Sequence, residues 1–451
     1  MASAYSRPSH RRSLRRRRTL VVSAAAVAAA VGVGVLVVNA NAGPVDLYHQ
    51  VLPAKDGWAA AGSGTTGGTK ADAAHTFTVS TRAQLVKALG SATDTAPRII
   101  KIKGMINANS NASGKKLTCA DYASGTGYSL SAYLKAFHPA TYGKKAPKGP
   151  QETARKAAAV KQKKNIVFRV PSNTTIVGVP GTKAGILGGS VLVQNVKNVI
   201  MRNLTFADTR DCFPQWDPTD GSSGEWNSNY DSVSLRGATN VWADHNTFTD
   251  APTFDKTQAT HFGRKYQVHD GALDITNGSD LVTVERNRFL NHDKTMLIGS
   301  SDTDSKGKLR VTIHHNVWKG IGQRAPLARI GRIHLYNNVY DTTTVNGYAS
   351  RYSIDSRAKA QVVAERNVWK IPAGAKAARL LSGDGTGSVA GTGNLVNGKA
   401  TDIVAAYNAA NSSKKLKTTA NWKPTLTSGL QASVRNLLTD LTSTTGAGTL
   451  S

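Results

Sequence analysis

Six charged side chains in the middle of the chain have the types needed to hold a metal ion and to remove a proton. In chain order they are Asp231, Asp270, Asp274, Lys294, Arg324 and Arg329. Carboxylate oxygens are the ligands that Ca²⁺ prefers. A nearby cation can hold an anion or, once it has lost its own proton, act as a base. The pattern predicts a calcium site that faces a proton-abstraction site.

The spacing of these residues requires bends in the backbone. Asp270 and Asp274 would lie on one face of a flat strand but about 13 Å apart, too far to share one ion. We therefore expect a bend at Gly271. Arg324 and Arg329 are five residues apart and would point to opposite sides of a regular strand. Pro326, which lacks a backbone donor, predicts a second bend that turns both toward one groove.

A repeated pattern indicates which elements carry these residues. Six segments alternate apolar residues at period two and end in an aromatic residue, so each is predicted to be a strand. Each carries an asparagine, and these are Asn203, Asn246, Asn287, Asn316, Asn338 and Asn367. The intervals between them are irregular but never shorter than about 22 residues, as expected for coil turns with inserted loops.

The fold predicted from this repeat is all-β, a single-stranded right-handed parallel β-helix with short capping helices at its ends. One asparagine per turn could stack its amide on that of the next turn and satisfy polar groups inside the coil. The alternative is that these asparagines mark ordinary turns. Helical segments are expected at 81–89, 401–410 and 429–438, where they would cover exposed strand edges.

The N-terminus has the features of a secretory signal. Residues 1–42 hold seven arginines and no acid, then an apolar run, then Ala40-Asn41-Ala42. We predict a signal peptide over 1–42 and a β-helix domain over 43–451, with a C-terminal covering segment from about 400 to 451. The sequence does not decide between general and twin-arginine export. An uncleaved membrane anchor is the alternative; otherwise we expect no stable membrane association and a secreted, extracellular monomer.

The net charge limits the kinds of molecule that the protein is expected to bind, and the two cysteines indicate a disulfide. The net charge is +29, and removing the seven N-terminal arginines leaves +22, which predicts attraction to a polyanion. Lysines and arginines are scattered without the basic stripe and interleaved aromatic residues of nucleic-acid binders, so an acidic polysaccharide is favoured over nucleic acid. Cys119 and Cys212 are predicted to form a disulfide in an oxidising compartment, with two buried thiols as the alternative.

Several ordered motifs resemble one enzyme family. They include NYDSV at 229–233, VWADHNTF at 241–248, HDGALDITNG at 269–278, HDKTMLIGSSD at 292–302 and QRAPLARIGRIHLYNN at 323–338. Together they are similar to extracellular pectate lyases of the Bacillus-like type, and the resemblance covers nearly all of the chain after the signal. It implies a parallel β-helix, bound Ca²⁺ and β-elimination of polygalacturonate, an acidic polysaccharide.

The resemblance also assigns roles. It implies that Asp231, Asp270 and Asp274 are the calcium ligands, that Arg324 is the catalytic base, and that Lys294 and Arg329 hold substrate carboxylates. Removing a proton requires an uncharged guanidine, a form that neighbouring cations favour, so high pH should favour turnover. Related enzymes often carry another carboxylate where this chain has Asn229 and another arginine where it has Leu327.

The sequence also allows other functions and other roles for single residues. A pectin lyase acting on methyl-esterified galacturonan would not need the three carboxylates, and a non-catalytic β-helix polysaccharide-binding protein would not need Arg324. Trp216 and Trp226 could stack on sugars or anchor a loop. Strand alternation predicts that Asp244 and His245 point apart, and likewise His314 and His315.

Overall fold

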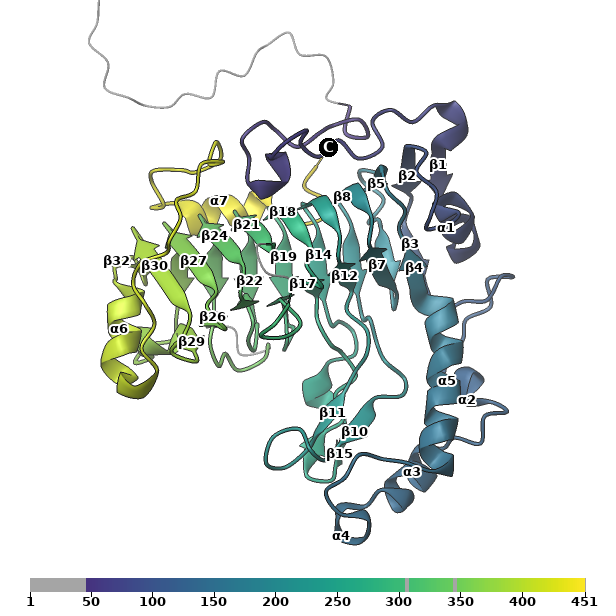
Figure 1. Cartoon of the computed structure of the whole chain (residues 1–451). Coiled ribbons are helices and arrows are strands. Elements are labelled where there is room, and N and C mark those ends of the chain that lie inside the picture. The colour runs from purple at the N-terminus through teal and green to yellow at the C-terminus, as the bar shows by residue number, and fades with distance from the viewer. Residues whose placement is uncertain (1–45, 305–307, 344–346, 451) are drawn as a thin grey trace, which may run out of the picture. The chain divides into compact units, whose positions relative to one another are not determined.

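The computed structural model describes residues 46–304, 308–343 and 347–450. The predicted signal peptide, residues 1–42, lies outside the described residues. Within the described residues, no helix has both the length and the apolar character needed to cross a membrane. The described part is a right-handed parallel β-helix, as the repeat predicted, with short helices around it (Figure 1).

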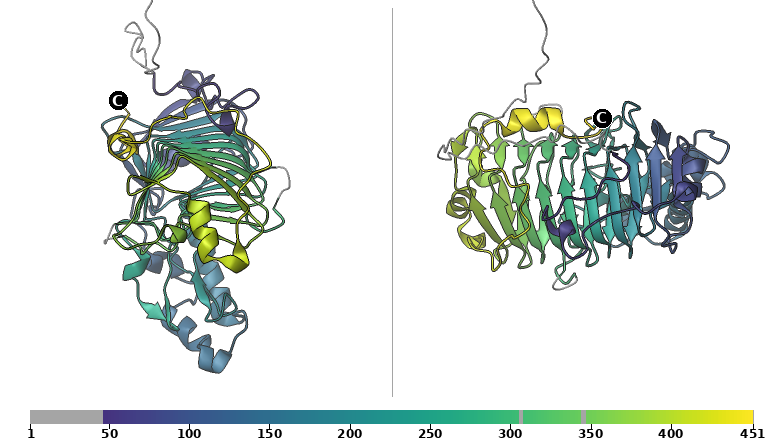
Figure 2. Two further views of the ribbon diagram at one scale, coloured as in Figure 1. Left: turned by 90° about the vertical axis from the view of Figure 1, so that its left-hand side faces the viewer. Right: turned by 90° about the horizontal axis from the view of Figure 1, so that it is seen from above.

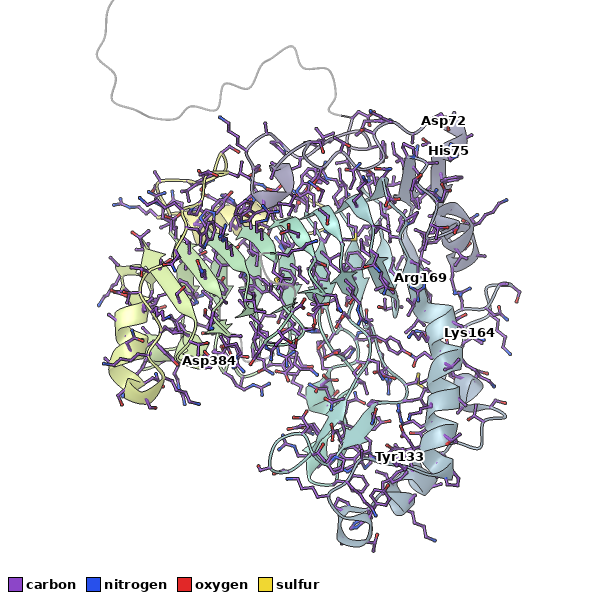
Figure 3. The ribbon with its side chains drawn as sticks, in the orientation of Figure 1. Asp72, His75, Tyr133, Lys164, Arg169 and Asp384 are labelled. Atoms are coloured by element: carbon purple, nitrogen blue, oxygen red, sulfur yellow. A yellow bond between two sulfur atoms is a disulfide. The ribbon has the colours of Figure 1, made fainter. Side chains whose placement is uncertain are left out.

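Three parallel sheets form the sides of the coil. Sheet 1 contains, in spatial order, β29 (Leu381–Gly383), β26 (Ile354–Arg357), β23 (Leu327–Arg329), β20 (Leu297–Ile298), β17 (Leu273–Thr276), β12 (Val233–Arg236), β7 (Ser190–Gln194) and β4 (Val167–Arg169). Figure 3 labels Arg169 in β4 near one end of this sheet and Asp384, directly after β29, near the other.

Sheets 2 and 3 complete each turn of the coil. Sheet 2 contains β1 (Thr76–Val79), β2 (Arg98–Ile102), β5 (Thr174–Gly178), β8 (Lys197–Arg202), β13 (Thr239–Asp244), β18 (Asp280–Glu285), β21 (Arg310–His314), β24 (Arg332–Tyr336), β27 (Gln361–Glu365) and β30 (Ser388–Thr392). Sheet 3 contains β3 (Met105–Asn107), β6 (Gly185–Leu187), β9 (Thr205–Ala207), β14 (Thr247–Thr249), β19 (Arg288–Leu290), β22 (Val317–Lys319), β25 (Val339–Asp341), β28 (Val368–Lys370), β31 (Leu395–Val396) and β32 (Lys399–Ala400), the last pair being antiparallel. From β4 to β31 the chain passes from sheet 1 to sheet 2 to sheet 3 in each turn, and the stacked strands are seen along the coil in Figure 2.

The repeated asparagines form a buried ladder. The amide Nδ2 of Asn246 donates to Oδ1 of Asn287 at 3.0 Å, and the same contact continues through Asn316, Asn338 and Asn367. The ladder ends at Asn394, which the sequence pattern did not include. Asn203 was wrongly assigned to it: the backbone amide of Leu204 meets the amide oxygen of Asn246, so Leu204 holds the ladder position.

Aromatic residues that close the repeated segments stack inside the coil. The rings of Phe248 and Phe289 are 4.9 Å apart and nearly parallel, and those of Tyr340 and Trp369 are 4.7 Å apart. The stack runs from Phe206 through Trp318 to Trp369. Because every turn must place a ring above the one before it, the stack reinforces the same register as the asparagine ladder.

Helices cover the ends and one side of the coil. At the N-terminal end, α1 (Arg82–Leu89) buries Leu85 and Leu89 against the core; at the other end, α6 (Ile403–Ala410) buries Ile403 and Tyr407. Both confirm the predicted helices. The helix predicted at 429–438 is wrong, because α7 spans Leu437–Thr444 and packs on the outside of sheet 3. The described part of the predicted covering segment, residues 400–450, thus covers both an end and a side.

A lobe extends from the turns that lead from sheet 3 to sheet 1. It contains α2 (Cys119–Ala123), α3 (Leu130–Ala136), α4 (Pro139–Tyr142), α5 (Pro150–Ile166), the hairpin of β10 (Gln215–Asp217) and β11 (Glu225–Asn227), and the hairpin of β15 (Thr260–His261) and β16 (Arg264–Lys265). Trp216 and Trp226 are buried there against Tyr133 and Phe137, so they anchor the lobe. The predicted disulfide between Cys119 and Cys212 is present and ties α2 to the loop after β9.

Candidate active site

The predicted site residues gather where the chain enters sheet 1. Asp231 lies just before β12, Asp270 just before β17, Lys294 just before β20 and Arg324 just before β23, while Asp274 belongs to β17. These strands are neighbours in sheet 1, so residues far apart in sequence lie on consecutive turns about 4.8 Å apart. Parallel stacking is therefore what brings five of the six predicted residues together.

Gly271 marks the point where the carboxylates converge. Its backbone N–H donates to Oδ1 of Asp231 at 3.0 Å, and a Cβ added to it would overlap carboxylate oxygens of both Asp231 and Asp274. The requirement for glycine is thus the close approach of two carboxylates. Asp274 is held in place because its Oδ1 accepts a hydrogen bond from the backbone of Leu297 at 2.9 Å.

The electrostatics of this group fit a bound cation. Burial and the negative charge of Asp270 raise the pKa of Asp231 to about 6. Burial and the charges of Asp231 and Asp270 raise the pKa of Asp274 well above its usual range, and the positive charge of Arg324 opposes that rise. Three neighbouring carboxylates whose charges repel one another are a donor set suited to Ca²⁺, which takes oxygen ligands in irregular geometry.

Lys294 and Arg324 stand beside the carboxylates at the wall of a cavity of about 630 Å³. Nζ of Lys294 lies 2.9 Å from Oδ1 of Asp270. Arg324 has a left-handed backbone with φ of 59°, directly before the cis Ala325–Pro326 bond. Its Nε is buried without a hydrogen-bond partner among the described residues, so the guanidinium is available to a ligand in the cavity.

Arg329 is placed differently from the other five. It ends β23 and its Nε lies 3.1 Å from Oδ1 of Asp302, while its Nη1 donates to the carbonyl of Gly299 at 3.2 Å. Like the three carboxylates, Arg329 is not among the residues that line the cavity of Lys294 and Arg324. The bend at Pro326 therefore does not bring Arg324 and Arg329 into that one cavity.

The chain is similar to known proteins over most of its length. The family model described as pectate lyase matches residues 149–449. A pectate lyase of Bacillus subtilis (strain 168) is 44% identical over 422 residues, which are 93% of this chain and 97% of that protein. Pectate lyase E of Dickeya dadantii (strain 3937) is 34% identical over 341 residues, which are 75% of this chain and 72% of that protein.

The chain belongs to the pectate lyase family and is a polysaccharide lyase. A solved structure described as a pectate lyase bound to hexasaccharide superposes with a TM-score of 0.84 at 42% identity, covering 90% of this chain and 100% of that one.

The lyase also contains a buried network that the sequence did not assign. Nε2 of His292 lies 2.8 Å from the backbone carbonyl of Asp270, and its Nδ1 contacts Asp250, which accepts a hydrogen bond from Tyr348 at 2.9 Å. This chain of contacts supports the backbone that carries Asp270 and Gly271. The only sequence signal was the position of His292 in the HDK motif.

A second part of this network surrounds His269. Its Nε2 lies 3.1 Å from Asp208 and its Nδ1 lies 3.1 Å from Asp255. Burial by itself would lower the pKa of His269, but the carboxylates of Asp250, Asp208 and Asp255 outweigh burial and raise that pKa to about 10. A charged histidine thus neutralises buried acids next to Asp270 in the chain.

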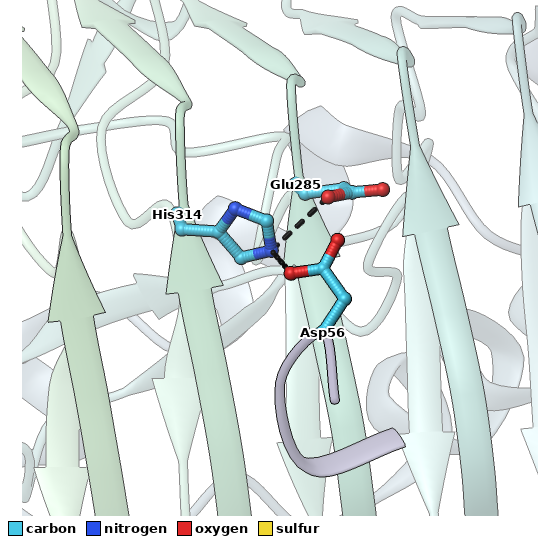
Figure 4. A group of neighbouring side chains, drawn as sticks. All are labelled: Asp56, Glu285 and His314. Atoms are coloured by element: carbon cyan, nitrogen blue, oxygen red, sulfur yellow. Dashed lines mark ion pairs between the residues drawn. The ribbon is translucent and has the colours of Figure 1, made fainter. Parts of the chain in front are cut away.

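A cluster on sheet 2 joins the N-terminal segment to the coil. Nε2 of His314 lies 3.1 Å from Glu285 and 3.4 Å from Asp56, which comes from the segment before η1 (Trp58–Ala60) (Figure 4). Trp242 donates to Glu285 at 2.8 Å, and His314 contacts His315 at 2.9 Å. These partners account for the cluster as an internal brace between distant segments.

The contact between His314 and His315 contradicts the prediction that the two side chains point apart. Asp244 and His245 likewise contact each other. In both pairs the second residue, His245 or His315, comes after the end of its strand and has a φ near 50°, so alternation along a strand no longer applies there.

Proposed function

We propose that this lyase is a secreted, calcium-dependent enzyme that cleaves α-1,4-linked polygalacturonate by β-elimination and releases unsaturated oligogalacturonides. The observation that carries the proposal is the approach of Asp231 and Asp274 at Gly271, next to Asp270 and its partner Lys294. A hexasaccharide bound to a related lyase, and the net charge of +22 that remains once the seven N-terminal arginines are removed from +29, support an anionic polysaccharide substrate.

Asp231, Asp270 and Asp274 would hold Ca²⁺. When bound, the cation would supply Lewis-acid chemistry that makes the C5 proton of a uronate more acidic. Lys294 would then exchange its contact with Asp270 for a contact with a substrate carboxylate. Arg329 would hold a second carboxylate after displacing Asp302.

Arg324 would remove the C5 proton. The electrons of the C5–H bond form the C4=C5 double bond while the C4–O4 bond breaks, and O4 takes a proton from water. The buried Nε of Arg324 and the absence of a side-chain partner among the described residues support this role, because no protein carboxylate there holds the guanidinium. A free guanidinium can face the sugar ring directly.

The absorbance of the unsaturated product tests this proposal. We expect growth in ultraviolet absorbance on polygalacturonate with Ca²⁺, and loss of that growth with a chelator. Arg324→Ala should abolish turnover while Arg332→Ala, which removes an exposed arginine on sheet 2, should leave it unchanged. Full activity in the chelator would remove calcium from the mechanism, and an active Arg324→Ala would remove the base.

Cleavage of an esterified substrate distinguishes a pectate lyase from a pectin lyase. A chain whose carboxylates are methyl esters would offer no anionic oxygen to a cation that Asp231, Asp270 and Asp274 would hold. We expect highly esterified pectin to be cleaved much more slowly than polygalacturonate in the same assay. Faster cleavage of the esterified polymer, unaffected by chelator, would favour a pectin lyase.

A further inference from the structure

A second cavity lies next to the proposed active site. It has a volume of about 700 Å³, and we call it the distal basic groove; the residues that define it here are Arg351, Tyr352, Lys376, Arg379, Tyr407 and Lys414. The groove and the active-site cavity share Arg351. In addition, the hydroxyl of Tyr352 donates to Gln323, a residue of the active-site cavity, at 3.3 Å.

Backbone hydrogen bonds between successive turns connect the groove to the wall of the active-site cavity. The N–H of Met296 donates to the carbonyl of Arg324, the N–H of Ala325 to Ser353, and the N–H of Ser353 to Leu380. Each bond joins one turn before a sheet 1 strand to the next turn. Arg324 before β23, Arg351 before β26 and Arg379 before β29 therefore follow one another along the coil, about 4.8 Å per turn.

The charge of the groove differs from that of the active site. Its lining includes four cations and no carboxylate, whereas the active-site cavity mixes cations with Asp220, Glu225, Asp255 and Asp293. Lys376, Arg379 and Lys414 are exposed and have no ion-pair partner in the part of the chain that the structure describes. Unpaired cations in a hollow form a region of positive potential that attracts anions.

We propose that the distal basic groove binds carboxylates of a galacturonan chain that extends beyond the cleavage site toward the α6 end of the coil. This inference rests on the proposed function. An acidic sugar chain laid along sheet 1 would meet the shared Arg351 and then Arg379, Lys376 and Lys414. The groove recognises charge without carboxylate ligands of its own, so it holds the polymer without a second metal ion.

Chain length is the variable that tests the groove. We compare kcat and KM on oligogalacturonates of increasing length for the wild type and for Lys376→Ser/Arg379→Ser/Lys414→Ser. The variant should raise KM for polygalacturonate on the order of tenfold, since each exposed contact is weak, with kcat unchanged. On the shortest oligomer that the wild type cleaves, kcat and KM should both be unchanged.

A matched variant controls for loss of general charge. Lys135→Ser/Lys163→Ser/Lys164→Ser removes three exposed cations from α3 and α5; Figure 3 labels Lys164 on α5, at the end of the coil away from α6. This control should leave KM for the polymer near the wild-type value. Equal KM values for the two triple variants, or a groove variant equally impaired on the shortest oligomer, would overturn the proposal.

Binding separates this inference from the proposed function. Calorimetric titration of Arg324→Ala with a long oligogalacturonate should show tighter binding than Arg324→Ala combined with the three groove substitutions. If the wild type proves inactive on polygalacturonate but this difference persists, the proposed function fails and the groove stands. If activity is normal and the difference is absent, the groove fails alone.

Discussion

At the scale of single residues, the lyase depends on the space left by one glycine. Gly271→Ala would push a methyl group into the oxygens of Asp231 and Asp274. We expect calcium affinity to fall about 10- to 100-fold, measured by calorimetry in chelator-treated protein. Gly391→Ala is the control, because its nearest contact would be a side-chain atom at 3.3 Å. Unchanged affinity in Gly271→Ala would separate Gly271 from the cation site.

The acidity of Asp231 predicts how calcium binding depends on pH. Its pKa is about 6 because of burial and the charge of Asp270, so protons compete with the cation below that pH. We expect the calcium Kd to rise steeply as the pH falls from 7 to 5. Asp231→Asn should bind more weakly and lose the step near pH 6. A Kd independent of pH over this range would contradict this assignment.

The same shift affects stability without calcium. A pKa raised from 3.8 to about 6 means that the folded protein holds this proton more tightly than the unfolded chain. Stability from this group is therefore present below about pH 4 and lost as the pH rises through 6. Added calcium should raise the melting temperature most above pH 6, which thermal unfolding with and without chelator would show.

Arg329 is tested through its partner Asp302. Exposed ion pairs contribute at most about 1 kcal/mol, so a substrate carboxylate can displace Asp302, whose side chain is 70% exposed. We expect Arg329→Ala to raise KM on the order of tenfold with little change in kcat, and Asp302→Ala to leave KM equal or lower. If Asp302→Ala raised KM as much as Arg329→Ala does, Arg329 would act through its ion pair with Asp302.

At the scale of elements, the asparagine ladder links the turns of the coil. Asn316→Ala removes bonds to Asn338, Asn287 and the backbone of Val284. Each buried group left unsatisfied costs about 1–3 kcal/mol, so we expect a clear fall in melting temperature. Asn394→Ala, at the ladder's end, should lower it less. Equal effects would mean that stacking along the ladder adds nothing.

The elements that could be predicted are those with a local repeat. Period-two alternation located the strands, and one asparagine per turn indicated the coil. Asn203 was misassigned because the pattern shifts by one residue there, and Leu204 shows this only through its contact with Asn246. The lobe could not be predicted, because Trp216 and Trp226 pack in one cluster with Tyr133 only once these distant parts of the chain have folded together.

The site was predictable to a similar degree. The motifs predicted that the carboxylates, Lys294 and Arg324 lie together, as they do in the structure, but spacing along the chain did not show which neighbouring strands bring them together. Arg329 shares their motif, yet Asp302 from the preceding turn pairs with it. His292 and Asp250 act through the backbone of Asp270, and no local pattern reports such a contact.

At the scale of the whole molecule, buried His269 sets an alkaline limit. Its pKa of about 10 exceeds the unfolded value near 6.5, so its stabilising charge is complete below pH 6.5 and lost as the pH rises through 10. We expect the melting temperature to fall as the pH rises from about 6.5 to 10 and the contribution of His269 to be lost above that. Asp208→Asn removes one carboxylate and should move that fall to lower pH. The same alkaline profile in both proteins would contradict this role.

The proposed reaction requires one cation held by three carboxylates opposite Arg324. A crystal structure of Arg324→Ala with Ca²⁺ and an oligogalacturonate tests it most directly. We predict a cation bound by Asp231, Asp270 and Asp274 that also contacts a uronate carboxylate, with the C5 hydrogen of that sugar facing residue 324. A cation bound elsewhere, or a sugar whose C5 hydrogen faces away from residue 324, would contradict the account.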